Sequence, residues 1–319
     1  MVMAEPNPLC SRCGKEIPPE SRFCLHCGKR VERRSIASGP APVRLQRALG
    51  DQYEVLEEIG SGSFAVVYSV FDLRLDRRLA VKVIRPEFIA SDVVVARFRR
   101  EAKIAAQLKH ENVMGITFAG EGAGLVYCAM PLIVGETLRE RVKARGALSA
   151  EQALRVFGEL AHGLAHAHAK GIIHRDVKPA NIMLDREADD RTVLLDFGIA
   201  KALIPTGGKL SISGQIIGSA EYMSPERKAG SKNIDARSDI YSMGVVAFQM
   251  LTARLPSGVD TSTQPATDTS YPVAPSLRAA RADVPEPFAA AIERCMCAKP
   301  EDRWASAIEA ATAAGAQIS

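Results

Sequence analysis

The sequence predicts an α+β fold in which antiparallel strands come first and helices follow. Residues 53–84 form three short runs of alternating apolar and polar side chains, separated by turns at 60–62 and 74–78. This pattern is typical of an antiparallel meander. Residues 91–110 show helical periodicity, and the apolar segment 239–251 predicts a further helix.

The chain has 319 residues, of which 47% are apolar, enough for a core larger than that of one average domain. No apolar run approaches the roughly 18 residues that a membrane span needs. The N-terminus carries acid and proline where a signal peptide would need an apolar stretch. We therefore expect a cytoplasmic protein with no membrane partner.

Four of the seven cysteines fall within eighteen residues as two C-x2-C pairs: Cys10, Cys13, Cys24 and Cys27. Each pair can bring two thiolates onto one Zn²⁺ from a tight turn. A disulfide framework is the alternative, but a reducing compartment favours metal. His26 could replace a cysteine as a ligand, although four thiolates already complete the site. Residues 10–30 resemble the zinc-ribbon modules of many bacterial and archaeal proteins.

The zinc-ribbon segment is assigned to residues 1–30, and residues 31–50 are predicted to be a flexible basic linker with at most a short helical turn. The formal charge is +4, and residues 1–50 carry nine Lys or Arg against four Glu. Thiolates on zinc would offset part of that excess, so nucleic acid is an unfavoured partner.

The glycine turn at 60–62 is followed by the strand residues Val66, Val67 and Tyr68. A dinucleotide-binding or Walker-type loop would require a helix there. A glycine-tipped hairpin can instead lay its backbone N–H groups over the phosphates of a nucleotide, because no side chain interferes.

Lys82 lies between apolar residues, so it either extends from an edge strand into water or points into a nucleotide cleft. Glu101 occupies the apolar stripe of the helix predicted over 91–110. Burying an unpaired carboxylate is costly, so Lys82 is its expected partner. The alternative is a glutamate on the rim of an amphipathic helix.

Residues 174–181 read HRDVKPAN and residues 196–198 read DFG. With Lys82 and Glu101 upstream, the chain resembles the eukaryotic-like (Hanks-type) protein kinase family from Ile59 to about residue 314, and most closely its bacterial serine/threonine branch. The resemblance implies a two-lobed kinase fold over 51–315. The small lobe, 51–131, would hold an antiparallel sheet and one helix, and the large lobe, 132–315, would be mainly helical.

The resemblance also implies the roles of individual residues in phosphoryl transfer from ATP. Asp176 would orient the substrate hydroxyl and accept its proton, and Lys178 would contact the γ-phosphate. Lys82, positioned by Glu101, would hold the α- and β-phosphates. Asn181 and Asp196 would hold Mg²⁺, or Mn²⁺ in its place, because hard cations prefer oxygen ligands.

The same resemblance places Met130 at the rear of the adenine pocket and gives the hinge carbonyl and amide to Pro131 and Ile133. Val67, Ala80 and Leu184 would enclose the base. Ala65 stands where the family usually has a third glycine. The complete predicted set of nucleotide contacts is Ile59, Gly60, Ser61, Gly62, Ser63, Phe64, Ala65, Val67, Ala80, Lys82, Met130, Pro131, Ile133 and Leu184.

The segment between Asp196 and Glu226 is too long for a passive loop. In the family such a segment is phosphorylated, and the resulting dianion binds the arginine beside the catalytic aspartate, here Arg175. Ser211 and Ser213 are the candidate sites, with autophosphorylation in a transient dimer as the expected route. A merely flexible polar loop is the alternative.

Other patterns are given structural roles. In the cluster of His162, His166 and His168, the first two have H-x3-H spacing, but we expect helix residues that pack or face solvent rather than a metal site. The resemblance pairs Glu226 with Arg303 and makes Asp239 a buried support for the catalytic loop. Cys128, Cys295 and Cys297 are expected in the core. The Ser/Thr-rich segment 257–270 is expected to be a loop.

The sequence thus favours an active protein serine/threonine kinase acting on protein substrates, with structural zinc and a protein partner for the ribbon. A nucleotide-binding pseudokinase scaffold is one alternative, although Lys82, Glu101, Asp176, Asn181 and Asp196 are all intact. A zinc-ribbon adaptor for nucleic acid or protein is the other, and it can coexist with catalysis.

Overall fold

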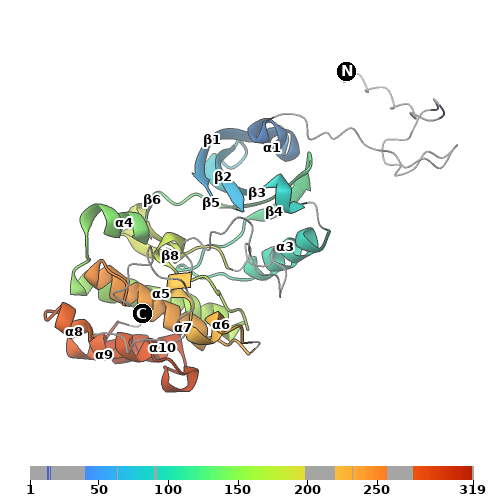
Figure 1. The fold of residues 1–319 in the computed structure, drawn as a ribbon. Helices are drawn as coiled ribbons and strands as arrows, with labels where there is room; N and C mark the ends of the chain where they lie inside the picture. The colour runs from blue at the N-terminus through green and yellow to red at the C-terminus, as the bar shows by residue number, and fades with distance from the viewer. Residues whose placement is uncertain are drawn as a thin grey trace.

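The computed structural model describes Cys13, Lys15 and residues 40–62, 64–89, 92–197, 220–231, 233–256 and 276–317, without the side chains of residues 92–94, 97 and 101. These residues form a small lobe built on a sheet and a larger, mainly helical lobe (Figure 1). The predicted two-lobed α+β fold is confirmed.

The small lobe is a five-stranded antiparallel sheet with the strand order β1-β2-β3-β5-β4. The predicted meander over residues 53–84 is confirmed as its first three strands. The strand bounds are β1 Tyr53–Ser61, β2 Ala65–Asp72, β3 Arg77–Ile84, β4 Phe118–Gly122 and β5 Leu125–Pro131.

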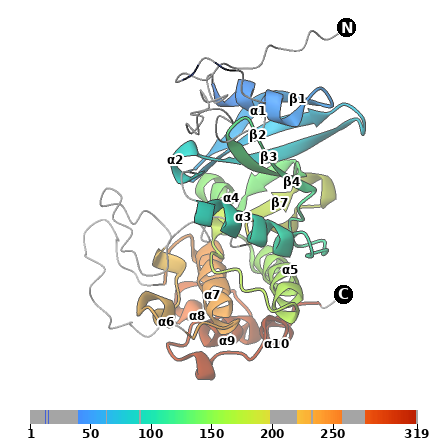
Figure 2. The same cartoon turned by 90° about the vertical axis from the view of Figure 1, so that its right-hand side faces the viewer.

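The two faces of this sheet carry separate apolar clusters, because successive side chains of a strand point to opposite faces. Leu79, Val81 and Val83 of β3 belong to one cluster and pack with Leu45 of helix α1 (Ala41–Leu49). Ile84 belongs to the other, which includes Phe98 of α3 (Asp92–Ala105). The sheet is therefore covered by α1 on its outer face and by α3 toward the large lobe (Figures 1 and 2).

Helix α1 is firmly joined to the sheet. The side chain of Leu45 is completely buried. The Arg44 guanidinium donates to the carbonyls of Ala123 at 3.1 Å and Gly124 at 2.8 Å. Gln46 accepts the N–H of Val55 at 2.9 Å. The prediction of a flexible linker over residues 31–50 is therefore wrong for residues 41–49, because this amphipathic segment buries apolar surface that the sheet would otherwise expose.

Helix α3 ends at Ala105, earlier than the predicted limit of His110, because the chain turns toward the large lobe. In that turn Asn112 donates its side-chain amide to the carbonyl of Thr192 at 2.9 Å and accepts the N–H of Leu194. A Cβ on Gly163 would lie 2.8 Å from the Asn112 carbonyl. The close approach of these segments requires glycine and ties the end of α3 to the large lobe.

The large lobe is built on buried helices, with α5 (Ala150–Ala169) and α7 (Arg237–Thr252) at its centre (Figure 2). Ser149 and Gln152 form a reciprocal capping box that starts α5. The apolar helix predicted over 239–251 is confirmed as α7. A small antiparallel sheet of β6 (Gly135–Thr137), β7 (Ile182–Asp185) and β8 (Arg191–Leu194) lies next to the small lobe.

The remaining helices are short. Near the small lobe lie α2 (Pro86–Ile89) and α4 (Leu138–Arg145), and the base of the large lobe holds α6 (Pro225–Lys228), α8 (Leu277–Ala280), α9 (Glu286–Cys295) and α10 (Ala307–Ala314). Single 3₁₀ turns occur at Pro179–Asn181, Arg186–Ala188, Ala220–Tyr222 and Pro300–Asp302. In the described part of the chain, no helix combines the length and apolar character that a membrane crossing requires.

The predicted Glu226–Arg303 pair is confirmed and closes the large lobe. Two parallel hydrogen bonds of 2.9 and 2.8 Å join the guanidinium to the carboxylate. Arg303 also donates to the carbonyls of Cys297, Arg237 and Ala298, which explains how its fully buried cation is tolerated. Burial alone would raise the pKa of Glu226, but hydrogen bonds from Arg303 and Ser238 lower it to about 2.

Replacing Leu45 by alanine tests the docking of α1. We expect Leu45→Ala to lower the free energy of unfolding by about 2–5 kcal/mol, because it leaves a cavity under the helix. Val43 lies on the same helix but is 52% exposed, so Val43→Ala should change it by less than about 0.5 kcal/mol. Urea denaturation measures both. Equal effects of the two substitutions would mean that α1 does not stabilise the sheet through Leu45.

The Glu226 carboxylate makes the stability of the large lobe depend on pH. Glu226→Gln should lower the free energy of unfolding at pH 7 by about 3 kcal/mol, because Arg303 loses its buried counter-ion. The folded pKa of about 2 lies below the ordinary 4.5, so the contribution of Glu226 is present above pH 4.5 and declines as the pH falls toward 2.

Urea denaturation at pH 7, 5 and 3.5 would measure this dependence. The difference between the wild type and Glu226→Gln should shrink at the lowest pH, whereas Glu187→Gln, at an exposed site, should have little effect throughout. A difference that stays constant from pH 7 to 3.5 would contradict the assignment.

Candidate active site

Lys82 lies at the centre of the small lobe and faces the large lobe. It is 8% exposed, and Val67 and Cys128 are its direct partners across β2 and β5. Directly opposed residues share a face of the sheet, so all three lie on the same face as Ile84 and the cluster under α3. Burial raises the pKa of the Cys128 thiol to about 12, in keeping with the buried cysteine expected there.

The ammonium of Lys82 forms an ion pair with Asp196, which follows β8 in the large lobe. Nζ lies 2.7 Å from Oδ1. Burial alone would lower the pKa of Lys82, but the attraction and hydrogen bond of Asp196 raise it, so the side chain is charged. The predicted partner, Glu101, is part of α3, but its side chain lies outside the description. The Lys82–Glu101 pair stays a prediction.

Asp176, Lys178 and Asn181 meet on the loop between α5 and β7. Lys178 Nζ lies 2.9 Å from Asp176 Oδ2. The Asn181 amide donates to the Asp176 carbonyl at 2.9 Å and to Oδ2 at 3.1 Å. Pro179–Asn181 form a 3₁₀ turn, which brings Asn181 back over Asp176. This turn explains how residues five positions apart come to share one site.

The loop is fixed from below by Asp239, a completely buried residue in the first turn of α7. Its carboxylate accepts the backbone N–H of His174 at 2.7 Å and of Arg175 at 2.8 Å. His168 Nε2 lies 2.9 Å from the same carboxylate. Burial would raise the pKa of Asp239, but these donors, with His168 foremost, lower it. The supporting role predicted for Asp239 therefore has a direct structural basis.

His174 links the two aspartates of the site. Its Nδ1 accepts the N–H of Asp176 at 3.1 Å, so Nε2 carries the proton that it donates to the Leu195 carbonyl at 2.6 Å. Burial lowers the pKa of His174, which favours this neutral tautomer. Its ring also contacts Phe197, with centroids 4.6 Å apart. The positions of Asp176 and Asp196 therefore depend on one imidazole.

Backbone strain occurs at two positions of the site. Arg175 and Asp196 have left-handed φ angles of 63° and 60°. Such conformations cost about 1–3 kcal/mol in residues other than glycine and persist only where surrounding contacts impose them. The hydrogen bond of Arg175 N–H to Asp239 and the ion pair of Asp196 with Lys82 are such contacts.

Three residues of the predicted adenine pocket lie on the same face of the sheet as Lys82. Ala80 is two residues before Lys82 on β3, and its partner across β5 is Met130, while Val67 pairs with Lys82 itself. Leu184 is buried on β7, in the small sheet of the large lobe. Pro131 ends β5 and Ile133 follows it, so both belong to the connection between the lobes. Contacts with a base remain predictions.

The glycine-tipped hairpin joins β1 to β2. Gly60 pairs with Val67, Ser61 pairs with Val66, and the N–H of Gly62 donates to Ala65 O at 2.9 Å. Phe64 packs on Phe88 of α2, with ring centroids 5.1 Å apart. Ile59 is 44% exposed, and Ser63 lies outside the described residues.

The site combines two cations with carboxylate and amide oxygens. Lys82 and Lys178 each lie within 2.9 Å of a carboxylate, those of Asp196 and Asp176. These oxygens, together with Asn181, fit a hard divalent cation such as Mg²⁺. Chemically, the arrangement can bind a polyphosphate and remove a proton from a hydroxyl group.

The sequence model of the protein kinase domain family matches residues 53–314 of this chain. The chain belongs to the protein kinase family. A separate match assigns residues 9–31 to the zinc-ribbon domain family.

Two similar curated proteins come from bacteria. This kinase is 36% identical over 261 residues to a probable serine/threonine-protein kinase of Clostridium acetobutylicum, covering 82% of this chain and 39% of that protein. It is 37% identical over 267 residues to the serine/threonine-protein kinase PknB of Mycolicibacterium smegmatis, covering 82% of this chain and 42% of PknB. The chain thus spans about two fifths of the length of these relatives.

Solved structures agree with the fold. A crystal structure of the Mycobacterium tuberculosis PknI kinase domain superposes with a TM-score of 0.65 at 29% identity, covering 83% of this chain and 95% of that one. The similarity extends over both lobes of the kinase.

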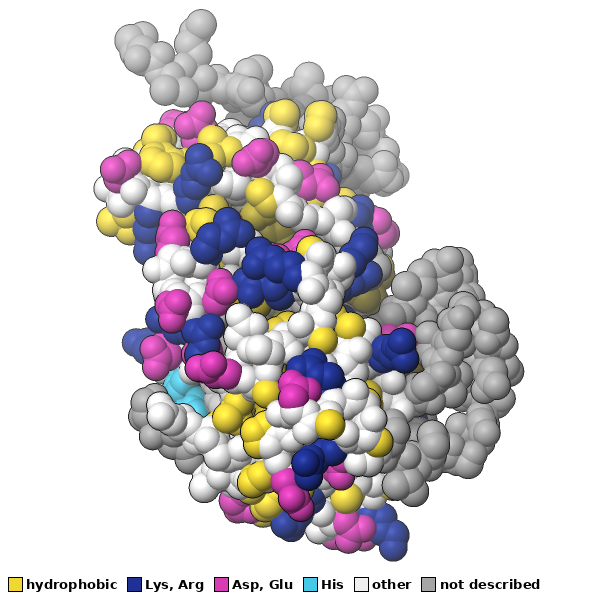
Figure 3. Space-filling model, turned by 90° about the vertical axis from the view of Figure 1, so that its left-hand side faces the viewer, with side chains coloured by type: hydrophobic (Ala, Val, Ile, Leu, Met, Phe, Trp, Pro, Cys, Tyr) yellow, Lys and Arg dark blue, Asp and Glu magenta, His cyan; other side chains and the backbone are white. Residues whose placement is uncertain are grey.

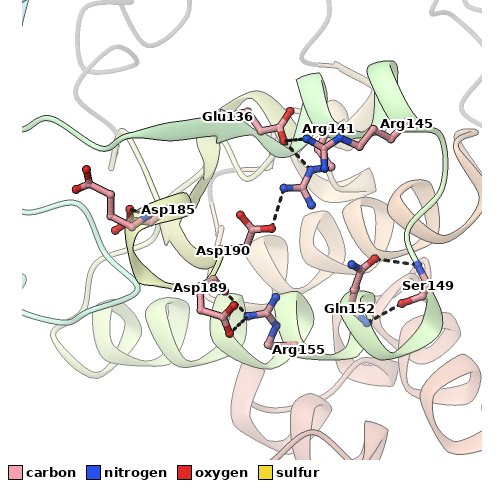
Figure 4. Close-up of polar contacts among 10 residues, drawn as sticks. Glu136, Arg141, Arg145, Ser149, Gln152, Arg155, Asp185, Asp189 and Asp190 are labelled. Carbon is pink, nitrogen blue, oxygen red and sulfur yellow. Dashed lines mark hydrogen bonds and ion pairs between the residues drawn. The ribbon is translucent and has the colours of Figure 1, made fainter.

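A second polar network, which the sequence did not predict, supports the segment after the lobe connection (Figure 4). The Arg141 guanidinium on α4 donates to Glu136 of β6 at 2.7 Å and to Asp190 at 2.8 Å. Glu136 pairs with Leu184, and a Cβ on Gly135 would come within 1.9 Å of the Leu184 carbonyl. This network therefore fixes β6 against β7, the strand that carries the predicted adenine contact Leu184.

Sequence reasoning also missed the hydrogen bond of His168 to Asp239. His162, His166 and His168 all lie on α5, as expected, but His168 has an additional role because it bonds the buried carboxylate of Asp239. His162 and His166 instead lie near the His110 ring, with centroids 6.5 and 5.0 Å away. Only the distance of His168 from the HRD sequence could have distinguished it.

Several predicted residues lie outside the described part of the kinase. They include the predicted phosphosites Ser211 and Ser213, the loop 257–270 and the predicted zinc ligands Cys10, Cys24 and Cys27. Cys13 is described and lies in an exposed turn. Arg175, the predicted phosphate receptor, lies directly beside Asp176 on the loop held by Asp239.

Proposed function

We propose that this chain is an active protein serine/threonine kinase that transfers the γ-phosphate of ATP to protein hydroxyl groups. The observation that carries the proposal is the convergence of Asp176, Lys178 and Asn181 with the Lys82–Asp196 pair, which joins the two lobes. A pseudokinase scaffold would normally lack at least one of these groups.

Each of these side chains has a task that its surroundings suit. The carboxylate of Asp176 accepts the proton of the attacking hydroxyl and holds that oxygen in line with the γ-phosphate. Lys178, 2.9 Å from Asp176, brings positive charge to the transferring group. Lys82 binds the α- and β-phosphates as a cation whose pKa is raised by Asp196.

Asp196 and Asn181 are the residues that would hold Mg²⁺. The bound cation would supply neutralisation of charge on the phosphate oxygens. The chain's own contribution is to fix these ligands. The Asn181 amide is hydrogen-bonded to the Asp176 carbonyl, and Asp196 directly follows Leu195, whose carbonyl accepts a hydrogen bond from His174.

The regulation of this activity and its partners are also part of the proposal. Phosphorylation of Ser211 or Ser213 within a transient dimer would place a dianion near Arg175. Protein substrates are expected, and nucleic acid is not, because charges of both signs are interspersed over the face in Figure 3.

The cytoplasmic location stays a prediction. The domain limits are also proposals: a zinc ribbon over 1–30, a linker over 31–50 and a kinase domain over 51–315. Helix α1 moves from the linker to the kinase domain, because it packs on the small lobe.

Phosphoryl transfer can be tested by incubating the purified chain with labelled ATP, Mg²⁺ and an acceptor protein such as casein. We expect Asp176→Asn to lower incorporation by about 10³-fold, because it removes the general base. The exposed Asp51→Asn is the matched control and should retain activity. Mapping the label tests Ser211 and Ser213. Equal label in the wild type and Asp176→Asn would contradict autocatalysis.

The zinc-ribbon match supports a second function, recognition of a protein partner through a zinc-stabilised module. We expect elemental analysis to find about one zinc per chain, lost in Cys10→Ser and Cys24→Ser because the ligand set is then incomplete. Cys297→Ser, in the large lobe, is the control and should keep the metal. Less than a tenth of an equivalent of zinc in the wild type would refute the assignment.

A further inference from the structure

Arg85, three residues after Lys82, is bonded to the glycine-tipped hairpin. Its Nε donates to the Gly62 carbonyl at 2.9 Å, and its Nη2 donates to Ser61 Oγ at 2.9 Å. Its own N–H donates to Phe64 O at 3.0 Å, one step beyond the last strand pair, Ala65 with Ile84. One residue therefore contacts both sides of the hairpin.

The ladder shows from which side Arg85 reaches the hairpin. Because Arg85 continues the pairing of β3, its side chain points to the face opposite that of Lys82 and Ile84. Tyr68 lies on that outer face, in the cluster under α1. Burial and Glu58 raise the pKa of Tyr68 and Arg85 opposes them, which agrees with a guanidinium on the outer side. Arg85 thus holds the hairpin from behind, away from the opening between the lobes.

This position affects how the hairpin presents its backbone. The guanidinium of Arg85 holds the Gly62 carbonyl and the Ser61 hydroxyl at the same time, so both residues are fixed relative to β3. Fixing a residue's backbone costs conformational entropy, and a hairpin that is already ordered does not impose this cost on ligand binding.

We propose that Arg85 is a positioning residue for the polyphosphate of the nucleotide, holding Ser61 and Gly62 so that the hairpin is ordered before the phosphates bind. This inference rests on the proposed function. The guanidinium suits the task because its planar fork makes two directed hydrogen bonds at once, which a lysine ammonium cannot match in geometry.

The test compares the binding of ADP and adenosine to the full chain by isothermal titration calorimetry. Arg85→Gln should weaken ADP binding by about 5- to 10-fold, the order of one or two hydrogen bonds. Adenosine lacks phosphates, so its affinity should change by less than about twofold. In steady-state assays the KM for ATP should rise by a similar factor while kcat stays within about twofold.

Two further variants separate positioning from direct contact. Arg85→Lys keeps the charge but not the fork, so it should lose ADP affinity almost as Arg85→Gln does. Retention of ADP affinity in Arg85→Lys would mean that the charge itself attracts phosphate, and the inference would fall. Arg78→Gln removes the same charge from an exposed site on β3 and should leave both affinities unchanged.

The other possible outcomes also distinguish the role of Arg85 from the proposed function. Unchanged ADP binding in Arg85→Gln, or an equal loss of ADP and adenosine binding, would overturn the positioning role. Failure of the wild type to bind ADP would overturn both this inference and the proposed function. Wild-type ADP binding without phosphotransfer would overturn the proposed activity alone, because the binding test of Arg85 needs no turnover.

Discussion

The contact between the Asp239 carboxylate and the backbone of the catalytic loop is the constraint on which the site depends. A carboxylate without exposed surface in the first turn of α7 must be matched by donors, and the N–H groups of His174 and Arg175 are those donors. Fixing His174 in turn fixes Asp176 through its N–H and Leu195 through its carbonyl. The acidic groups of the site thus share one buried anchor.

The small lobe meets this anchor at two places. Lys82 reaches Asp196 from the face of the sheet that α3 covers, and Asn112 ties the end of α3 to β8 through Thr192 and Leu194. A side-chain contact and a backbone contact therefore both end on the segment that carries Asp196.

Around this shared centre the chain adds supports of its own. Helix α1 covers the outer face of the sheet with Leu45, and Arg85 holds the hairpin from the same side. Arg141 joins β6 to the turn before β8 (Figure 4), so the small sheet that carries Leu184 is also fixed. These groups touch no proposed substrate atom. Their effect is to restrict the backbone of the surfaces between which a nucleotide would bind.

The sequence by itself determined the family and the strand meander, and it predicted the reactive side chains, because these depend on short spacings such as HRDVKPAN and on local periodicity. It also determined the Glu226–Arg303 pair, through the family pattern. Only the tertiary structure decided that Lys82 contacts Asp196, that residues 41–49 dock as a helix, and that His168, Arg85 and Arg141 support the site. Most of those contacts join residues far apart in the chain. Each of these side chains has several possible charged or polar partners in the sequence, and which partner lies within bonding distance is set only when the elements pack together.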